Sequence, residues 1–391
     1  MTAHPALPHA QPADVGLCPE RTQRLMDVLR REVATGRLPG AVAMIARRGQ
    51  IGLFEAVGQQ DPGTGTPMKT DSIFRIYSMT KPVVSVAVMM LVERGQLLLS
   101  DPVSRWLPEY ANQQVATAQG LEPVRQAATV QDLLRHTAGL TYEFLGDSPV
   151  QRQYGAVKIA SRERTNAEFS QTLATLPLQF QPGTVWAYSR ATDVLGRLVE
   201  VVSGQSLGAF LQAEIFAPLG MVDTGFAVPP EQQHRIAEPF AHDPDGGVPM
   251  KVLEPRQVPA MEGGGGGLMS TAMDYARFLQ CLRNRGELNG VRLLGPHTVD
   301  YMTADHLGDM PADGTLLPPG HGFGLGFAVR THLGLSPVPG SVGLYYWGGI
   351  AGTTFFVDPA LDMYAMLMIQ APNQRDYYRP LFRDLVYAAL T

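Results

Sequence analysis

The chain has 391 residues, of which 45% are hydrophobic and 17% are charged, as expected for a globular protein with a large core and two lobes. Its formal net charge is −5 and it has no basic block, which excludes nucleic acid as an expected partner. No apolar run is long enough to cross a bilayer, and the two cysteines, Cys18 and Cys281, are too few for a disulfide framework.

The N-terminal hundred residues predict a helix, a β-hairpin and a buried helix. Residues 1–17 contain three prolines and lack the basic and apolar regions of a signal peptide, so we expect a cytoplasmic protein without membrane contact. Apolar side chains recur along one side of 19–37, which is typical of an amphipathic helix. Two apolar runs within 40–58 flank a polar turn and predict the hairpin. The second helix follows Ser78 and ends near Gly95.

The middle third of the chain, from Asp101 to about Pro249, loses the strand pattern and gains helical ones. Its apolar residues follow a helical period in four segments, at 130–135, 165–176, 191–203 and 207–216. Pro218 should end the last of these helices, because proline cannot donate the next helical hydrogen bond. We therefore expect an α-rich lobe in this part of the chain.

Five consecutive glycines at 263–267 follow this lobe. They have no strand before them and no Gly-Lys-Ser/Thr after them, so they do not form a phosphate loop. We interpret them as a place where the backbone closely approaches another element. Ser270 and Thr271 then cap a helix that runs to about Asn284.

The last third returns to strands and closes with a helix. Runs rich in aromatic and apolar residues predict strands at 323–329, 343–348, 353–357 and 363–369, and a helix at 381–390. The simplest packing is an α+β fold in which one antiparallel sheet from both chain ends is flanked by helices, with the α-rich lobe inserted. We predict an α/β domain from 1–100 and 263–391 and a mainly helical domain at 101–262, with a ligand cleft between them.

Ser78 and Lys81 are the most informative pair of side chains. They lie three residues apart, where an exposed turn runs into the buried helix, so both occupy one face. A shielded lysine has a lowered pKa and can take the serine proton or position another base. Pro82 fits the first helical turn, which places Ser78 near a helix N-terminus, where the dipole favours negative charge on its oxygen.

Two further stretches hold candidate site residues. Tyr188 follows Trp186 in a turn before the helix at 191–203, and a phenol beside an ammonium ionises more readily and can carry protons. In Trp347-Gly348-Gly349-Ile350, two glycines let the backbone approach a ligand, and the next N–H can point at an oxyanion. Taken alone, Tyr188 is better explained as a side chain that packs the lobe, and the alternative for the second stretch is an ordinary strand-end turn.

Gly204-Gln205-Ser206-Leu207-Gly208 spells G-x-S-x-G, the nucleophile elbow of another class of hydrolases. That elbow must follow a strand, but the preceding residues have helical periodicity, so we expect Ser206 to cap a helix. His136 and His321 lack a matching Asp-plus-His arrangement, and we assign them structural or surface roles. The chain has no metal-ligand spacing, so we expect no metal.

Ser78-Met79-Thr80-Lys81, Tyr188-Ser189-Arg190 and Trp347-Gly348-Gly349 together resemble the three motifs of the penicillin-recognising serine hydrolases. That superfamily includes class C β-lactamases, D-alanyl-D-alanine carboxypeptidases and the β-lactamase-like family VIII carboxylesterases. The first motif, S-x-x-K, is matched in full, whereas Y-x-N is matched in part because Arg190 replaces the amide. Trp347 stands where K-T-G or H-T-G has its cation, a variant that looks like the esterase branch. Further similar stretches are 133–140, 217–221 and 263–271.

The resemblance implies a cofactor-free acyl transfer in two steps. Ser78 would form an acyl-enzyme while Lys81 and Tyr188 move the protons, and the oxyanion would lie between the backbone N–H groups of Ser78 and Ile350. The substrate would lie against Trp347, Gly348 and Gly349, with Arg190 nearby to restore positive charge. Because Trp347 offers an apolar wall in place of a carboxylate-binding cation, we expect a carboxylesterase for short- to medium-chain esters, with at most weak β-lactam hydrolysis.

Other functions on the same site stay open. They are a β-lactamase or amide or peptide hydrolase, an acyltransferase to a small alcohol or amine, and a non-catalytic acyl-sensing binding protein. From position in the chain alone, we expect the acyl pocket to be lined from 142–145, 261–268 and 323–325.

Overall fold

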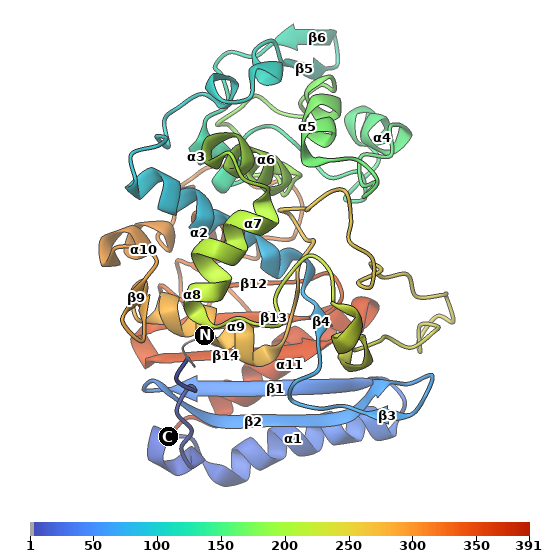
Figure 1. The fold of residues 1–391 in the computed structure, drawn as a ribbon, viewed down its shortest axis with the longest axis vertical. Helices are drawn as coiled ribbons and strands as arrows, with labels where there is room; N and C mark the ends of the chain where they lie inside the picture. The colour runs from blue at the N-terminus through green and yellow to red at the C-terminus, as the bar shows by residue number, and fades with distance from the viewer. Residues whose placement is uncertain (1–3) are drawn as a thin grey trace.

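The computed structural model describes residues 4–391 (Figure 1). Its centre is an antiparallel sheet of eight strands in the order β10-β11-β12-β13-β14-β1-β2-β3. The early and late parts of the chain meet inside this sheet, where β1 (Gly40–Arg47) pairs with β14 (Met363–Ile369) over their whole lengths. The predicted α+β fold, with one sheet built from both chain ends, is therefore confirmed.

The remaining strands of the sheet are β2 (Gln50–Asp61), β3 (Thr66–Pro67), β10 (His321–Phe323), β11 (Ala328–Arg330), β12 (Tyr345–Gly348) and β13 (Thr354–Asp358). One face is covered by α1 (Pro19–Ala34) and α11 (Arg375–Ala388), and α9 (Ala272–Arg283) lies against the other (Figure 1). Both faces of β1 are therefore buried: Ala41, Ala43 and Ile45 join the cluster under α1 and α11, whereas Val42, Met44 and Ala46 join the cluster around α9. This burial explains why β1 is a continuous apolar run instead of an alternating one.

The helical lobe stands above the sheet in Figure 1. It contains the hairpin of β5 (Gln114–Thr117) and β6 (Gly120–Pro123) and the helices α3 (Val130–Leu134), α4 (Pro149–Ala156), α5 (Asn166–Ala174), α6 (Ala191–Ser203), α7 (Leu207–Leu211) and α8 (Ala217–Leu219). Thr129, Ser148 and Thr165 begin three of these helices with capping boxes. Outside the lobe are α10 (Pro296–Met302) and two short ribbons, β4 (Phe74–Arg75) with β7 (Met269–Ser270) and β8 (Glu287–Leu288) with β9 (Val291–Arg292).

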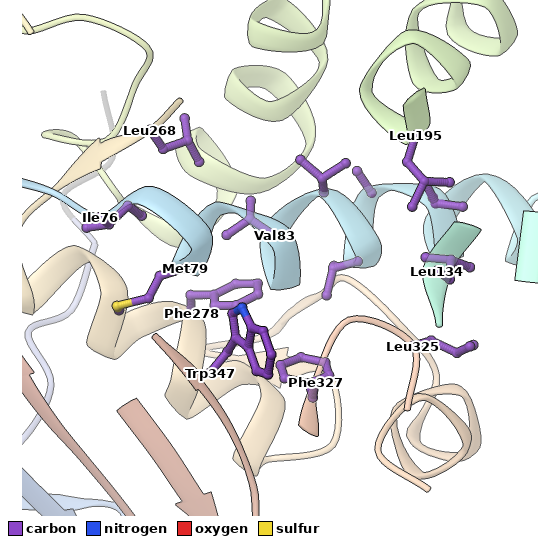
Figure 2. Close-up of a cluster of buried hydrophobic side chains, with 14 of the residues drawn as sticks. Ile76, Met79, Val83, Leu134, Leu195, Leu268, Phe278, Leu325, Phe327 and Trp347 are labelled. Carbon is purple, nitrogen blue, oxygen red and sulfur yellow. The ribbon is translucent and has the colours of Figure 1, made fainter. Parts of the chain in front are cut away.

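The helix α2 (Thr80–Glu93) joins the lobe to the sheet. Around it, Val83 of α2, Leu195 of α6, Phe278 of α9 and Trp347 of β12 belong to one apolar cluster (Figure 2). Since this core runs through α2 from one lobe into the other, both lobes hold α2 and the residues just before it in place. The division into domains at 1–100 with 263–391 and at 101–262 stays a prediction.

The structure corrects the predicted strand at 323–329. It contains two short strands, β10 and β11, joined by a tight turn in which Gly326 has φ +99°. A Cβ at Gly326 would lie 2.3 Å from the Ser85 hydroxyl oxygen, so the turn also packs directly against α2. The continuous apolar run concealed the turn, because the residues on both sides of it are buried.

Two helix ends also differ from the prediction. Pro218 does not end the helix that starts at Leu207; a π-helical turn at Gln212–Phe216 changes the hydrogen bonding ahead of it, and the helix ends at Gly220, where φ is +71°. The last helix begins at Arg375, earlier than the predicted 381, and contains Pro380, a residue that usually interrupts a helix; the buried Tyr378 holds its first turns against the core.

No single helix within residues 4–391 is long and apolar enough to span a membrane. In the same range, only the helix pair Ala191–Ser203 and Leu207–Leu219 has this length and composition when both helices are counted together, and the pair is bent by 78°. In the same part of the chain, His, Cys, Asp and Glu side chains form no group of three or more that is placed to hold a metal ion.

Candidate active site

Ser78 lies in a 3₁₀ turn, Tyr77–Met79, that leads directly into α2. The residue before it, Tyr77, has φ +44°, a value that residues other than glycine rarely adopt. The Tyr77 hydroxyl accepts a hydrogen bond from the Leu253 N–H at 2.7 Å, and the Ile76 N–H donates to the Leu268 carbonyl at 3.1 Å. Contacts from segments far away in the sequence therefore hold the turn of Ser78 in a strained conformation.

The five glycines form the wall opposite this turn. A Cβ on Gly264 would lie 2.4 Å from the Thr192 carbonyl oxygen, and one on Gly265 would lie 2.7 Å from a carboxylate oxygen of Asp193. The predicted close approach of the backbone is confirmed. Because the backbone passes so close, the Gly265 carbonyl accepts a hydrogen bond from the Lys81 ammonium.

Lys81 is 1% exposed and uses all three of its N–H bonds. Its Nζ donates to the Ser78 Oγ at 3.3 Å, to the Tyr142 Oη at 2.9 Å and to the Gly265 carbonyl at 2.6 Å. The same nitrogen lies 4.6 Å from the centre of the Tyr188 ring. The structure thus brings together Ser78, Lys81 and Tyr188, the three side chains predicted to carry the chemistry.

The predicted lowering of the Lys81 pKa is wrong. Burial lowers this pKa, but the negative charge that Tyr142 and Tyr188 can carry, together with the Asp193 carboxylate, outweighs burial and raises it. Lys81 therefore stays an ammonium at neutral pH. In this geometry it donates hydrogen bonds to the Ser78 Oγ, the Tyr142 Oη and the Gly265 carbonyl.

Tyr188 lies just before α6, and its side chain is buried among aromatic rings. Its Oη accepts a hydrogen bond from the Trp347 indole N–H at 3.1 Å, and the two rings are 5.1 Å apart. Trp347 was predicted only as an apolar wall for the substrate. The structure adds that Trp347 fixes the oxygen of Tyr188, a contact that joins β12 to the helical lobe.

Tyr142 is the member of the site that the sequence analysis placed only in a pocket-lining segment. Its Oη accepts the shortest of the two side-chain hydrogen bonds from Lys81, and its ring is 5.2 Å from that of Tyr188. Burial raises the pKa of Tyr142, although the Lys81 ammonium opposes this shift. No local pattern marks Tyr142, and only its position shortly after the 133–140 stretch gave a signal.

Arg190 lines the same cavity, but its charge is already balanced. Its guanidinium pairs with the Glu143 carboxylate at 2.5 Å and with Asp193 at 3.4 Å, and it lies over the Tyr142 ring. The suggestion that Arg190 supplies free positive charge to a substrate therefore loses its physical basis. The geometry instead ties Arg190 to the carboxylates and the ring around Lys81.

The turn between β12 and β13 carries Ile350. The Gly349 N–H donates to the Thr353 carbonyl at 2.8 Å, and the Thr353 hydroxyl donates to the Ile76 carbonyl at 3.3 Å. The turn thus rests on the backbone two residues before Ser78. Within residues 4–391, neither the Ser78 N–H nor the Ile350 N–H donates to another group, and both residues line one cavity.

That cavity has a volume of about 700 Å³. It is lined by Ser78, Tyr142, Phe144, Tyr188, Trp347 and Ile350, and also by the basic side chains of Arg162, Lys251, Arg375, Arg379 and Arg383. The predicted pocket segments 142–145 and 261–268 both contribute to the lining. The third, 323–325, does not: Phe323 and Leu325 are fully buried, and Leu325 packs in the core around α2 (Figure 2).

The remaining candidates keep the roles predicted for them. Ser206 is exposed and caps α7, since its Oγ accepts from the Ala209 N–H at 3.2 Å, and the segment before it is the helix α6. His136 is buried behind Tyr188, where burial lowers its pKa well below the usual value. Burial also lowers the pKa of His321 to about 4. Neither histidine hydrogen-bonds to a carboxylate in residues 4–391, so no triad forms.

We expect Trp347→Phe to lower kcat for ester hydrolysis about tenfold, because phenylalanine keeps the apolar wall but removes the hydrogen bond to Tyr188. The measurement is kcat and KM with p-nitrophenyl butyrate. Trp186→Phe is the matched control, since Trp186 is fully buried and its indole nitrogen has no hydrogen-bond partner in the described chain. Equal kcat values for both variants would contradict a role for the Trp347 N–H.

Proteins of known family resemble this chain in sequence and in structure. The family model described as "Beta-lactamase" matches residues 25–388. Esterase EstB of Burkholderia gladioli is 37% identical, with 99% of this chain and 100% of its own length covered, and protein Rv1367c of Mycobacterium tuberculosis is 38% identical over 87% and 88%. The solved structure of EstCE1, "a hydrolase with promiscuous acyltransferase activity", matches with a TM-score of 0.83 and 29% identity, covering 94% of this chain and 98% of that one. The chain therefore belongs to the beta-lactamase family and is a serine hydrolase of its family VIII carboxylesterase branch.

Proposed function

We propose that the protein is a serine carboxylesterase that hydrolyses short- to medium-chain carboxylic esters through an acyl-enzyme on Ser78. The observation that carries this proposal is the contact of the buried Lys81 ammonium with the Ser78 Oγ at 3.3 Å, at the inner end of a cavity walled by Trp347. The esterase activity named for EstB supports the same reaction class.

In this proposal Lys81 and Tyr188 move the protons together, and the Tyr188 Oη accepts the proton from Ser78. The Lys81 ammonium over its ring and the Trp347 N–H at its oxygen both stabilise negative charge there. The proton moves from the Ser78 Oγ to the Tyr188 Oη as Oγ bonds to the ester carbonyl carbon. It then passes to the leaving alkoxide as the ester C–O bond breaks.

The second half repeats these steps with water as the nucleophile. Tyr188 accepts a proton from water as the water oxygen attacks the acyl carbon, and that proton returns to the Ser78 Oγ when the acyl-enzyme bond breaks. In both halves the backbone N–H groups of Ser78 and Ile350 are the donors for the oxyanion. One such donor is typically worth about 10²–10³ in kcat.

The substrate class follows from what surrounds Trp347. Gly348 and Gly349 pack directly against Arg379 and Ile76, so neither glycine brings a cation to the substrate, and Arg190 is already paired with acidic side chains. A neutral ester therefore meets an apolar wall, whereas a β-lactam carboxylate finds no cation at the position of Trp347.

We expect kcat/KM for p-nitrophenyl butyrate to exceed that for nitrocefin by about tenfold or more, a difference of about 1.4 kcal/mol in transition-state binding. A series of acyl chains from acetate to decanoate, measured on the same enzyme, then gives the length that the cavity accepts. Faster turnover of nitrocefin would mean that arginines lining the cavity, such as Arg375 and Arg383, hold its carboxylate. The β-lactamase alternative would then replace the esterase.

Acyl transfer to an alcohol is the second candidate, favoured by the activity named for EstCE1. The acyl-enzyme on Ser78 would then be attacked by an alcohol oxygen in place of water, with Tyr188 accepting the alcohol proton. Adding a primary alcohol to the ester assay and quantifying the new ester by chromatography separates the two reactions.

A further inference from the structure

Arg379 lies directly behind the turn that carries Ile350. It belongs to the first turns of α11, and its Nη2 donates to the Gly349 carbonyl at 2.5 Å and to the Thr353 carbonyl at 3.3 Å. Its Nε is buried and has no partner, and no carboxylate pairs with its guanidinium within residues 4–391. Burial lowers the pKa of Arg379 to about 10. A buried cation without an acidic partner lowers the stability of the folded protein. Stability therefore does not explain why Arg379 contacts this turn.

Arg379 and Ile76 account for both glycines of the turn. A Cβ on Gly348 would lie 2.7 Å from the Arg379 Nη2 and 2.8 Å from its Cζ. A Cβ on Gly349 would lie 2.4 Å from the Ile76 carbonyl oxygen. The first glycine therefore makes room for the guanidinium, and the second lets the turn contact the backbone just before Ser78.

The Gly349 carbonyl and the Ile350 N–H belong to one peptide group. Because that group is planar and trans, its C=O and N–H point in opposite directions. Arg379 holds the carbonyl from the side of α11, so the Ile350 N–H points away from the guanidinium. The Gly352 N–H also donates to this carbonyl, at 3.0 Å, but only Arg379 brings a positive charge to it. A charged donor on the oxygen polarises the peptide and strengthens its N–H as a donor.

We propose that Arg379 is a positioning residue for the oxyanion hole: by holding the Gly349 and Thr353 carbonyls, it aims and polarises the Ile350 N–H. The substrate never touches Arg379 in this role. The inference rests on the proposed acyl transfer at Ser78, and it assigns the N–H of Ile350 a support from α11.

The test compares the wild type with Arg379→Met, Arg379→Lys and Arg379→Ala. We expect Arg379→Met to lower kcat for p-nitrophenyl butyrate about 30-fold while KM changes less than about threefold, since a weakened oxyanion donor affects the transition state alone. The inhibition constant of butylboronic acid, which forms a tetrahedral adduct with an oxygen in the oxyanion position, should rise by a similar factor. Methylguanidinium should restore part of the kcat of Arg379→Ala. The kcat of Arg379→Lys should lie between those of the wild type and Arg379→Ala, because lysine keeps the positive charge but loses the planar set of guanidinium N–H donors.

Arg47→Met is the matched control. Arg47 lies in β1 and in the described chain also donates only to backbone carbonyls, at Leu361, Val15 and Gly16, but it does not line the cavity. We expect this variant to lower the Tm and to leave kcat and the boronate inhibition constant unchanged. If Arg379→Met unfolds, Arg379→Lys supplies the same two readouts.

Three results would overturn the inference. Arg379 variants could keep wild-type kcat; they could lose kcat with an unchanged boronate inhibition constant; or Arg379→Ala could lose kcat with no recovery in methylguanidinium. Each of these leaves the esterase itself intact. A wild-type protein that turns over no ester and does not react with a fluorophosphonate at Ser78 would instead overturn the proposed function, and this inference with it.

Discussion

Ser78→Ala should abolish ester hydrolysis, with kcat/KM for p-nitrophenyl butyrate falling by about 10⁴-fold or more. Without the Oγ no acyl-enzyme forms, and the remaining oxyanion donors and binding contacts accelerate only direct attack by water. A fluorophosphonate probe should add its mass to the wild type and not to the variant. The Tm should stay close to the wild-type value, because alanine fits the turn and the Tyr77 and Ile76 anchors remain.

Ser206→Ala is the control for this experiment. Ser206 lies in the G-x-S-x-G stretch, but its Oγ only caps α7, so we expect full activity and a loss of about 1 kcal/mol in stability. If Ser206→Ala lost activity and Ser78→Ala kept it, the nucleophile would be misassigned.

Lys81→Met should lower kcat by about 10³-fold and also lower the Tm. Methionine fills a similar volume but removes the ammonium that donates to the Ser78 Oγ and stabilises charge on Tyr188. It leaves the Tyr142 Oη and the Gly265 carbonyl without their donor, and an unpaired buried acceptor costs about 1–3 kcal/mol of stability. Steady-state kinetics and thermal unfolding on the same sample measure both.

Two variants make the Lys81 result specific. Lys69→Met changes an exposed lysine and should alter neither quantity. Lys81→Arg keeps the charge but cannot fit three converging donors to the same partners, so it should be nearly as inactive as Lys81→Met. A rate within tenfold of the wild type in Lys81→Met would argue against any role for the ammonium in proton transfer.

The spacing of apolar residues and the positions of turn-forming and capping residues predicted much of the fold. The bounds of α6 and β14 agree with the predicted segments, because each has a complete apolar pattern and a clear break at both ends. The strand at 323–329 was wrong because the turn at Gly326 lies inside an apolar run, and only its contact with Ser85 of α2 explains it. Tertiary contacts of this kind leave no local pattern.

The candidate site likewise has one contact that the sequence spacing predicts and others that only the fold creates. Ser78 and Lys81 are neighbours on one turn, so their spacing alone predicts their contact. The direction of the Lys81 pKa depends on Tyr142, Tyr188 and Asp193, which only the fold brings to it. Glu143 likewise balances Arg190 from another part of the chain, 47 residues away. Local spacing therefore predicted the contact of Ser78 with Lys81, whereas the electrostatics of this pair required the structure.

The pairing of β1 with β14 has a consequence for how the protein is made. Arg47, at the end of β1, bonds to Leu361, which lies 314 residues further along the chain. During synthesis the β1–β2 hairpin therefore leaves the ribosome with an open, apolar strand edge long before β14 exists to cover it. Such long-range pairing slows folding and exposes the nascent chain to aggregation. Holdase chaperones and low expression temperature should therefore raise the soluble yield more than changes to the finished surface do.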